Sequence, residues 1–357
     1  MRFATIVGAR PEFVQLSPVS QAQRRLHDEV IIHTGQPYDG RMSGNVFAEL
    51  ELPAPAYNLG IGSGPHGAQT GRMLEALEDV LLTVRPDGVI VFGDTNSMLA
   101  ATLAAVKLHI PVAHVEAGLR SFNRAMPEEI NRLVTDHLAT RLFCPTETAR
   151  KNAEREGIIH GVEVVGDVMF DILLQIRPRL VERAAALLPQ LSVAARDYVL
   201  VTVHRPANTD DPEAMRRIAG ALDDLGTTVV FPIHPRTRKL TEQYGIVWSE
   251  RVLLVEPLGH QDFLALAQAA HREATDSGGV QKQAFLLRVP CITLRDETEW
   301  IETVESGWNV LVGNDRAAIV AAMQRLTPAP PAHNPFGQGD AAERIAHSLR
   351  AWPAPPG

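Results

Sequence analysis

Short apolar runs alternate along the chain with longer segments in which apolar residues recur at helical spacing. The first half contains six such runs, at residues 3–8, 29–35, 88–94, 111–117, 141–145 and 162–167. Five more follow in the second half, at residues 198–204, 228–234, 251–257, 290–296 and 309–313. Because runs that are apolar throughout are typical of strands buried on both faces, the pattern predicts parallel sheets joined by helical crossovers.

The two series of runs predict two doubly wound α/β domains, separated by a charged helical stretch. We place the first domain at residues 1–170 and the second at residues 171–335. A proline-rich segment at 327–337 leads into a last amphipathic helix at 340–352, which we expect to pack back on the first domain. Ligands of open α/β sheets bind beyond the carboxyl ends of the strands, so we expect the site in the cleft between the domains.

The composition is that of an ordinary globular protein and narrows the function by exclusion. Of 357 residues, 45% are hydrophobic and 21% charged, and the net charge is −8 without a basic block, which argues against a nucleic-acid partner. The two cysteines, Cys144 and Cys291, lie inside apolar runs, and we interpret them as buried reduced thiols. No apolar run approaches the ~18–20 residues of a membrane span, so we expect a soluble cytoplasmic protein.

Acidic residues lie at or near the ends of predicted strands. Asp94 follows one strand, and Glu116 lies inside the apolar end of the next, where an unpaired carboxylate is costly. Glu128 and Glu129 begin a predicted helix. Asp94 can instead be a helix cap, worth about 1 kcal/mol, and one of the two glutamates can be a cap as well. Three carboxylates converging on one cleft would suit proton transfer.

Basic residues and histidines follow other strands. Arg10 begins a helix after the first strand, where a guanidinium can clamp a phosphate or can equally form a surface salt bridge with a neighbour. Arg120 and Arg132 can either neutralise a phosphate or pair with the nearby glutamates. His204 and His234 each end a strand of the second half, and each can equally be a satisfied structural histidine.

The stretch 275–281, TDSGGVQ, has the pattern of a phosphate-binding helix start. Ser277 offers a hydroxyl, and Gly278 and Gly279 leave the backbone N–H groups bare, which suits a diphosphate. The segment in front, HREA at 271–274, is polar where a buried strand is expected, so we expect a short or distorted strand there. Nucleoside triphosphatase, dinucleotide and zinc motifs do not occur in the sequence. These residues alone predict a diphosphate site and an acidic, histidine-containing cleft, and they leave the reaction open.

A series of short motifs occurs in one order across nearly the whole chain: GARPE, HTGQ, GDTNS, HVEAGLR, PEEINR, VGD, HR, HP and DSGG.Q. With these motifs the sequence closely resembles the non-hydrolysing UDP-N-acetylglucosamine 2-epimerases. Residues 120–123 and 298–309 resemble the branch that includes epimerases of UDP-2,3-diacetamido-2,3-dideoxyglucuronate.

The resemblance implies two facing Rossmann-like domains of the GT-B type, a homodimer, and no metal or nicotinamide cofactor. It implies interconversion of UDP-GlcNAc and UDP-ManNAc for surface polysaccharide precursors, by anti elimination of UDP to 2-acetamidoglucal and re-addition of UDP. Carried over by position, the catalytic residues are Asp94, Glu116, Glu128 and His204. The substrate-binding positions are Arg10, Arg132, His234, Ser277, Gly278, Gly279 and Gln283, and Gln36 lies at a regulatory position.

The chain departs from the family pattern at three positions. Gln283 stands where the family usually has the glutamate that holds the ribose hydroxyls, so we expect weaker UDP binding. Lys282 occurs in one branch only, and Pro37 replaces a histidine of the allosteric site of many members, which leaves regulation by substrate open. The diacetamido uronate is the rival substrate and would need an extra cation near C6. The sequence is also compatible with a GT-B glycosyltransferase, a hydrolysing epimerase or an inactive sugar-nucleotide-binding protein.

Overall fold

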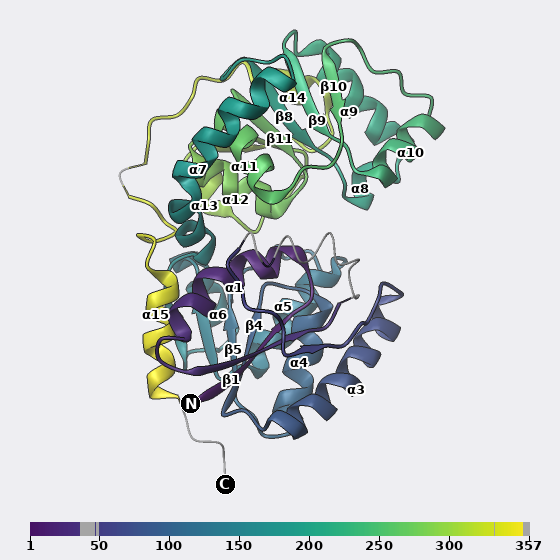
Figure 1. The fold of residues 1–357 in the computed structure, drawn as a ribbon. Helices are drawn as coiled ribbons and strands as arrows, with labels where there is room; N and C mark the ends of the chain where they lie inside the picture. The colour runs from purple at the N-terminus through teal and green to yellow at the C-terminus, as the bar shows by residue number, and fades with distance from the viewer. Residues whose placement is uncertain (36–46, 48–49, 332, 353–357) are drawn as a thin grey trace. The chain divides into compact units, whose positions relative to one another are not determined.

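The computed structural model describes residues 1–35, 47, 50–331 and 333–352, and the chain divides into two compact units. Unit 1 comprises Met1–Leu174 and Asn334–Gly357, and unit 2 comprises Gln175–His333. The division falls inside the long helix α7 (Val168–Gln190). Each unit contains one parallel sheet with helices packed on it (Figure 1). The predicted α/β class with two doubly wound parallel sheets is confirmed.

The sheet of unit 1 has seven strands in the order β3-β2-β1-β4-β5-β6-β7. Its strands are β1 (Arg2–Val7), β2 (Asp28–His33), β3 (Tyr57–Asn58), β4 (Gly88–Phe92), β5 (Val112–Val115), β6 (Arg141–Cys144) and β7 (Val162–Val164). Its helices are α1 (Arg10–Gln23), α3 (His66–Val84), α4 (Asn96–Lys107), α5 (Pro127–Leu138), α6 (Glu147–Arg155) and α15 (Ala341–Ser348). All strand pairs are parallel, with Thr5 of β1 beside Ile31 of β2 and Ile90 of β4.

Helices α3 and α4 cover one face of this sheet, and α15 lies beside α1 (Figure 1). Ile6, Val91 and Leu77 belong to the core under α3 and α4. The segment after α15 is anchored by Trp352, whose ring meets that of Phe3 edge-on at 5.2 Å. Its indole Nε1 also donates to the carbonyl oxygen of Asp87 at 2.8 Å. The chain after the proline-rich segment therefore completes the core of unit 1.

The sheet of unit 2 has six parallel strands in the order β10-β9-β8-β11-β12-β13. They are β8 (Tyr198–Thr202), β9 (Thr228–Pro232), β10 (Val252–Val255), β11 (Arg272–Thr275), β12 (Cys291–Thr293) and β13 (Asn309–Leu311). The helices are α8 (Pro206–Thr209), α9 (Pro212–Asp224), α10 (Pro235–Gln243), α11 (His260–Ala269), α12 (Gly278–Leu287), α13 (Ile301–Glu305) and α14 (Arg316–Met323). Its core includes Val201, Met215, Phe231 and Ile292.

Every apolar run singled out in the sequence forms a strand, and β3 adds a strand of two residues that the pattern does not predict. We expect a short or distorted strand at 271–274; β11 has four residues, and the expected distortion is wrong, because β11 pairs in regular parallel register with both β8 and β12. Arg272 and Glu273 are buried in this strand. The Arg272 guanidinium donates to the carbonyl oxygens of Met323 and Arg325, and these hydrogen bonds explain how the charged group of Arg272 can be buried.

Two smaller expectations also concern the described residues. Cys144 and Cys291 are both buried free thiols, as predicted. In the part of the chain that the structure describes, no helix combines the length and the apolar character needed to cross a membrane.

Candidate functional site

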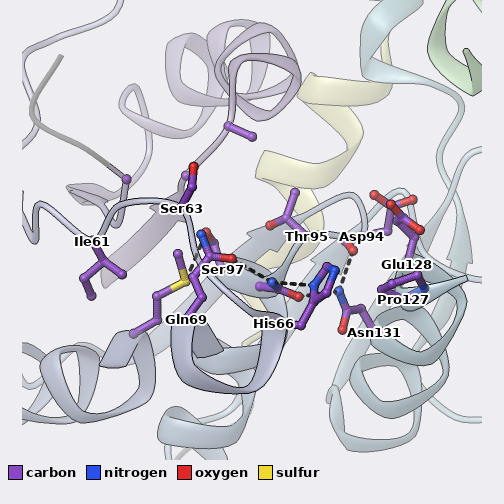
Figure 2. Close-up of a pocket in the computed structure, with 15 residues that line it drawn as sticks. Ile61, Ser63, His66, Gln69, Asp94, Thr95, Ser97, Pro127, Glu128 and Asn131 are labelled. Carbon is purple, nitrogen blue, oxygen red and sulfur yellow. Dashed lines mark hydrogen bonds between the residues drawn. The ribbon is translucent and has the colours of Figure 1, made fainter. Parts of the chain in front are cut away.

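The chemistry expected in the first half gathers where β1 and β4 lie side by side. The sheet order reverses at this pair of strands, and such switch points are where open α/β sheets bind ligands. A pocket of about 350 Å³ opens beyond the carboxyl ends of the two strands (Figure 2). It is lined by Gly8, Ala9, Gly35, Ile61, Ser63, His66, Gln69, Met73, Asp94, Thr95, Asn96, Ser97, Pro127, Glu128 and Asn131.

Asp94 lines this pocket and is not the cap of the helix that follows it. The N-cap of α4 is Thr95, whose side chain accepts a hydrogen bond from the Met98 N–H at 3.3 Å. The Asp94 carboxylate is instead 2.6 Å from Arg132 Nη1, and its side chain is 38% exposed. The carboxylate is thus held by an arginine on one side and open to the pocket on the other.

The structure separates the roles of the two adjacent glutamates at the start of α5. Glu129 is buried and accepts hydrogen bonds from the backbone N–H groups of Ser121 and Phe122, at 2.9 and 3.0 Å. Burial opposes its ionisation, yet the hydrogen bonds from Arg132 and Ser121 hold the pKa of Glu129 below its ordinary value. Glu129 therefore fixes the loop before α5, and Glu128 is the member of the pair that lines the pocket.

Arg132 lies between two carboxylates of unit 1. Its Nη1 is 2.6 Å from Asp94, and its Nη2 is 2.7 Å from Glu129. Its predicted contact with phosphate stays a prediction. Arg120, the other arginine considered for that role, pairs with Asp136 at 2.7 Å and with Glu156 at 2.8 Å.

Glu116 follows β5 and has a positive φ, as do seven other described non-glycine residues. Its φ is +72°, the left-handed region, which costs a side-chain-bearing residue roughly 1–2 kcal/mol. Gln15 Nε2 donates to Glu116 Oε2 at 2.6 Å. A β-carbon placed on Gly93 would lie 3.8 Å from Glu116 Oε2, so this carboxylate lies beside the residue that precedes Asp94. Strain of this kind is commonly maintained at functional sites.

A buried network fixes the loops that carry Asp94 and Glu116. His114 Nδ1 is 2.7 Å from Asp136, and its Nε2 is 2.8 Å from the carbonyl oxygen of Gly93. Asp136 also accepts from the backbone N–H of Gly118 at 3.1 Å. Burial alone would raise the pKa of Asp136, but His114 and Arg120 hold this pKa below its ordinary value. The ends of β4 and β5 are therefore tied together by a carboxylate that is itself away from the pocket.

Glu12 ties the loop after β1 to the loop after β4. Its carboxylate accepts from the backbone N–H groups of Gly8 and Ala9, at 2.5 and 2.9 Å, and from Thr95 Oγ1 at 2.5 Å. Burial raises the pKa of Glu12 to about 7, against the effect of these hydrogen bonds. Sequence reasoning missed this residue, because the pattern of α1 gives no sign that its partner is 83 residues away.

Amide and imidazole groups complete the pocket (Figure 2). Asn96 Nδ2 donates to Gln69 Oε1 at 2.8 Å and lies 3.1 Å from His66 Nδ1. Asn131 Nδ2 donates to the carbonyl oxygen of Asp94 at 2.9 Å. Sequence reasoning missed these residues as well. Asn131 follows Glu128 by three residues on a helix and so shares its face, a signal that could have found it.

Replacing Thr95 with alanine is expected to lower the free energy of unfolding by about 2–3 kcal/mol, because the variant loses both the N-cap of α4 and the hydrogen bond to buried Glu12. The Thr95→Ser variant keeps the hydroxyl and should retain most of that stability. Urea denaturation of both variants beside the wild type measures the difference. Equal losses in the two variants would show that the methyl group, and not the hydroxyl with its two hydrogen bonds, carries the effect.

In unit 2 the sheet order reverses at β8 and β11, and two candidate residues follow these strands. His204 follows β8, and its side chain is 51% exposed. Ser277 follows β11 as the N-cap of α12, with backbone torsions of −84° and 128°. The structure thus brings the histidine and the expected anion-binding helix start to one edge of the same sheet.

The two glycines of this helix start have different environments. A β-carbon on Gly278 would collide with Glu299 Oε1, so close approach of this side chain requires the glycine. A β-carbon on Gly279 would meet no described atom outside its own helix and chain neighbours within 4 Å. The Glu299 side chain lies against Gly278, and the predicted contact of a diphosphate with Gly278 and Gly279 stays a prediction.

The remaining predicted residues lie in different places. His234 is the N-cap of α10, where its Nδ1 accepts from the Arg236 N–H at 3.2 Å. Gln283 is half-buried on α12. Arg10 is the first residue of α1, and Gln36 and Pro37 lie outside the described residues. Among the residues that are described, no three histidine, cysteine, aspartate or glutamate side chains group as metal ligands.

The comparisons with known proteins agree with one another. The family model described as UDP-N-acetylglucosamine 2-epimerase matches residues 20–350. A Methanococcus maripaludis protein named UDP-N-acetylglucosamine 2-epimerase homolog is 48% identical over 98% of this chain and 99% of its own. The UDP-2,3-diacetamido-2,3-dideoxy-D-glucuronate 2-epimerase of Pseudomonas aeruginosa is 44% identical at the same coverage. The crystal structure of Methanocaldococcus jannaschii UDP-GlcNAc 2-epimerase with UDP-GlcNAc and UDP, 44% identical, matches 98% of this chain and 99% of its own with a TM-score of 0.91.

Proposed function

The chain belongs to the UDP-N-acetylglucosamine 2-epimerase family, and we propose that it interconverts UDP-GlcNAc and UDP-ManNAc without hydrolysing them. One observation carries this proposal. Asp94 and Glu128 line the same pocket, and the strained Glu116 lies beside Gly93, the residue that precedes Asp94. Moving the weakly acidic proton at C2 from one face of a sugar to the other requires a base and an acid, and carboxylates held in fixed positions supply both.

The proposed reaction is an anti elimination followed by re-addition. A carboxylate takes the C2 proton, the C–H electron pair forms the C1=C2 bond, and UDP leaves C1 with the electrons of the C1–O bond. In the return step a UDP oxygen attacks C1, and C2 takes a proton on the opposite face. Asp94, Glu116 and Glu128 are the candidates for these transfers, and the assignment of the base among them stays open.

We assign the leaving diphosphate to the start of α12. Backbone N–H groups at a helix N-terminus stabilise developing negative charge, and Ser277, Gly278 and Gly279 begin this helix. His204 is the catalytic histidine of the proposal. The other proposed substrate contacts are Arg10, Arg132, His234 and Gln283. The proposed reaction needs no cofactor. We also propose that the protein is a homodimer in the cytoplasm.

The second candidate substrate is UDP-2,3-diacetamido-2,3-dideoxyglucuronate. The relative named for that substrate and the one named for UDP-GlcNAc are each 44% identical to this chain. Both sugars undergo the same proton transfer at C2, so the three carboxylates suit either one. The pocket lining combines amides, hydroxyls and one imidazole with the carboxylates, and such neutral groups match an acetamido substituent.

Incubation with UDP-GlcNAc in deuterated water, followed by NMR, tests the proposal. The expected result is UDP-ManNAc that carries deuterium at C2, because the abstracted proton exchanges with solvent before re-addition. Free ManNAc with UDP would instead indicate a hydrolysing enzyme. No exchange and no product would contradict the UDP-GlcNAc assignment, and the same experiment with the diacetamido uronate then decides between the two substrates.

A further inference from the structure

We propose that Asp276 is a positioning residue for His204: its carboxylate selects the imidazole tautomer that carries hydrogen on Nδ1 and so leaves Nε2 free for the substrate. This inference rests on the role proposed for His204. It concerns a residue of unit 2 that follows β11, immediately before the helix start of α12.

Asp276 is fully buried, and its described side-chain hydrogen bonds all go to residues 204–208. Each carboxylate oxygen of Asp276 lies 3.1 Å from the backbone nitrogen of His204. Oδ2 also accepts from the backbone N–H of Arg205 at 2.9 Å. Asn208 Nδ2 donates to the same oxygen at 3.2 Å and to the Leu294 carbonyl oxygen at 3.0 Å. Asp276 therefore fixes the backbone from which the His204 ring projects.

The carboxylate also faces the ring itself. His204 Nδ1 lies 3.4 Å from Asp276 Oδ1, while about half of the histidine side chain is exposed. A carboxylate accepts hydrogen bonds and does not donate them, so this pair interacts favourably only when Nδ1 carries the hydrogen. The lone pair of the neutral imidazole is then on Nε2. The distance is long for a hydrogen bond, as catalytic pairs often are before a substrate binds.

The arrangement has a chemical consequence for the proposed reaction. A histidine whose Nδ1 lies near a buried carboxylate can take or return a proton through Nε2 without rotating its ring. In the proposal Asp276 sets both the tautomer and the orientation of the His204 ring, and it does not touch the substrate. Asp276 would then matter for turnover far more than for binding of the nucleotide.

The first test is the tautomer of His204 in the unmodified protein. In ¹⁵N-labelled protein at a pH where the ring is neutral, nitrogen chemical shifts separate the Nδ1–H form from the Nε2–H form. The His204→Gln variant identifies the signal among the 13 histidines of the chain. The Nδ1–H form is expected, and a resting protein with the Nε2–H form would overturn the proposal whatever any variant does.

The second test is the Asp276→Asn variant. The amide keeps the shape and one acceptor oxygen, but its NH₂ group now faces Nδ1 and favours the Nε2–H form. We expect kcat to fall by about 10²–10⁴-fold, the range for a misplaced general acid or base, with KM changed only a few-fold. The nitrogen spectrum should show the tautomer change in the same sample.

Asn208→Ala is the matched control, because it removes another partner of Asp276 and leaves the carboxylate facing His204. This variant should lose stability yet keep the Nδ1–H form, with kcat within about 10-fold of the wild type. Unchanged kcat in Asp276→Asn, with an active wild type, contradicts the positioning role. If the wild type exchanges no C2 proton with either sugar nucleotide, the proposed function fails, and the tautomer measurement still decides how Asp276 and His204 interact.

Discussion

Replacing Glu116 with glutamine is expected to stop exchange of the C2 proton, lowering kcat by at least about 10³-fold while UDP affinity stays within a few-fold. The amide has nearly the same shape as the carboxylate but cannot accept a proton at neutral pH. Deuterium incorporation at C2, followed by NMR, measures the rate, and calorimetry with UDP measures the affinity.

The backbone at Glu116 explains why we select this carboxylate for the largest effect. Its φ of +72° is maintained although a β-carbon makes it costly, and Gln15 Nε2 holds one carboxylate oxygen at 2.6 Å. Strain and orientation together place one carboxylate beside Gly93 with little freedom.

Glu51→Gln is the matched control for this variant. Glu51 is exposed in the same unit and also has a positive φ, of 54°, so the substitution and the type of backbone are the same. It should leave exchange unchanged. Normal turnover in Glu116→Gln would remove Glu116 from the reaction and leave Asp94 and Glu128 as the carboxylates to test.

Much of the fold could be predicted, because its strands are buried on both faces and therefore read as continuous apolar runs. The two-residue strand β3 is too short to produce such a pattern. The division between the units falls at 174/175 inside α7, near the predicted boundary at 170/171, because the charged helical stretch marks the region but a continuous helix does not mark the exact residue. Strand β11 is regular although Arg272 and Glu273 are polar, because its neighbours β8 and β12 impose the register.

The candidate site could be predicted as far as the ends of the strands, and its internal contacts could not. Sequence position did not separate Glu128 from Glu129, because both lie in the first turn of α5, where a helix favours any carboxylate. The two glutamates differ because the backbone N–H groups of residues 121 and 122 donate to Glu129. Likewise Gln15 meets Glu116 across 101 residues, a distance along the chain that no local pattern spans.

Replacing Glu273 with methionine is expected to stabilise the protein by an amount on the order of 4 kcal/mol at pH 7, a second large effect that needs no substrate. Glu273 is buried in the central strand β11, and neither carboxylate oxygen has a hydrogen-bond partner among the residues that the structure describes. Its neighbour Tyr198 donates its hydroxyl to the carbonyl oxygen of Leu266 instead. Methionine has about the same length and leaves no polar atom unpaired.

The direction of the pH dependence follows from the protons that each state binds. Burial raises the pKa of Glu273 from 4.5 to about 8, so between these values the folded protein holds a proton that the unfolded chain has released. The free energy of unfolding therefore falls as pH rises through this window, by about 1.4 kcal/mol per unit. That amounts to roughly 3 kcal/mol at pH 7, and the unpaired neutral carboxyl adds about 1–3 kcal/mol at any pH.

Urea denaturation from pH 5.5 to pH 8 separates these two parts, with tryptophan fluorescence as the signal, since Trp248, Trp300 and Trp308 lie in unit 2. The gain from Glu273→Met should grow by about 1.4 kcal/mol per pH unit. Glu273→Gln should remove the same pH dependence but keep an unpaired amide, and so gain less. The exposed Glu242→Gln on α10 should change neither quantity. If the methionine variant has the same advantage at every pH, Glu273 is ionised in the folded protein and has found a partner. Stability falls with pH only when a carboxylate keeps its proton in the folded state after the unfolded chain has lost it.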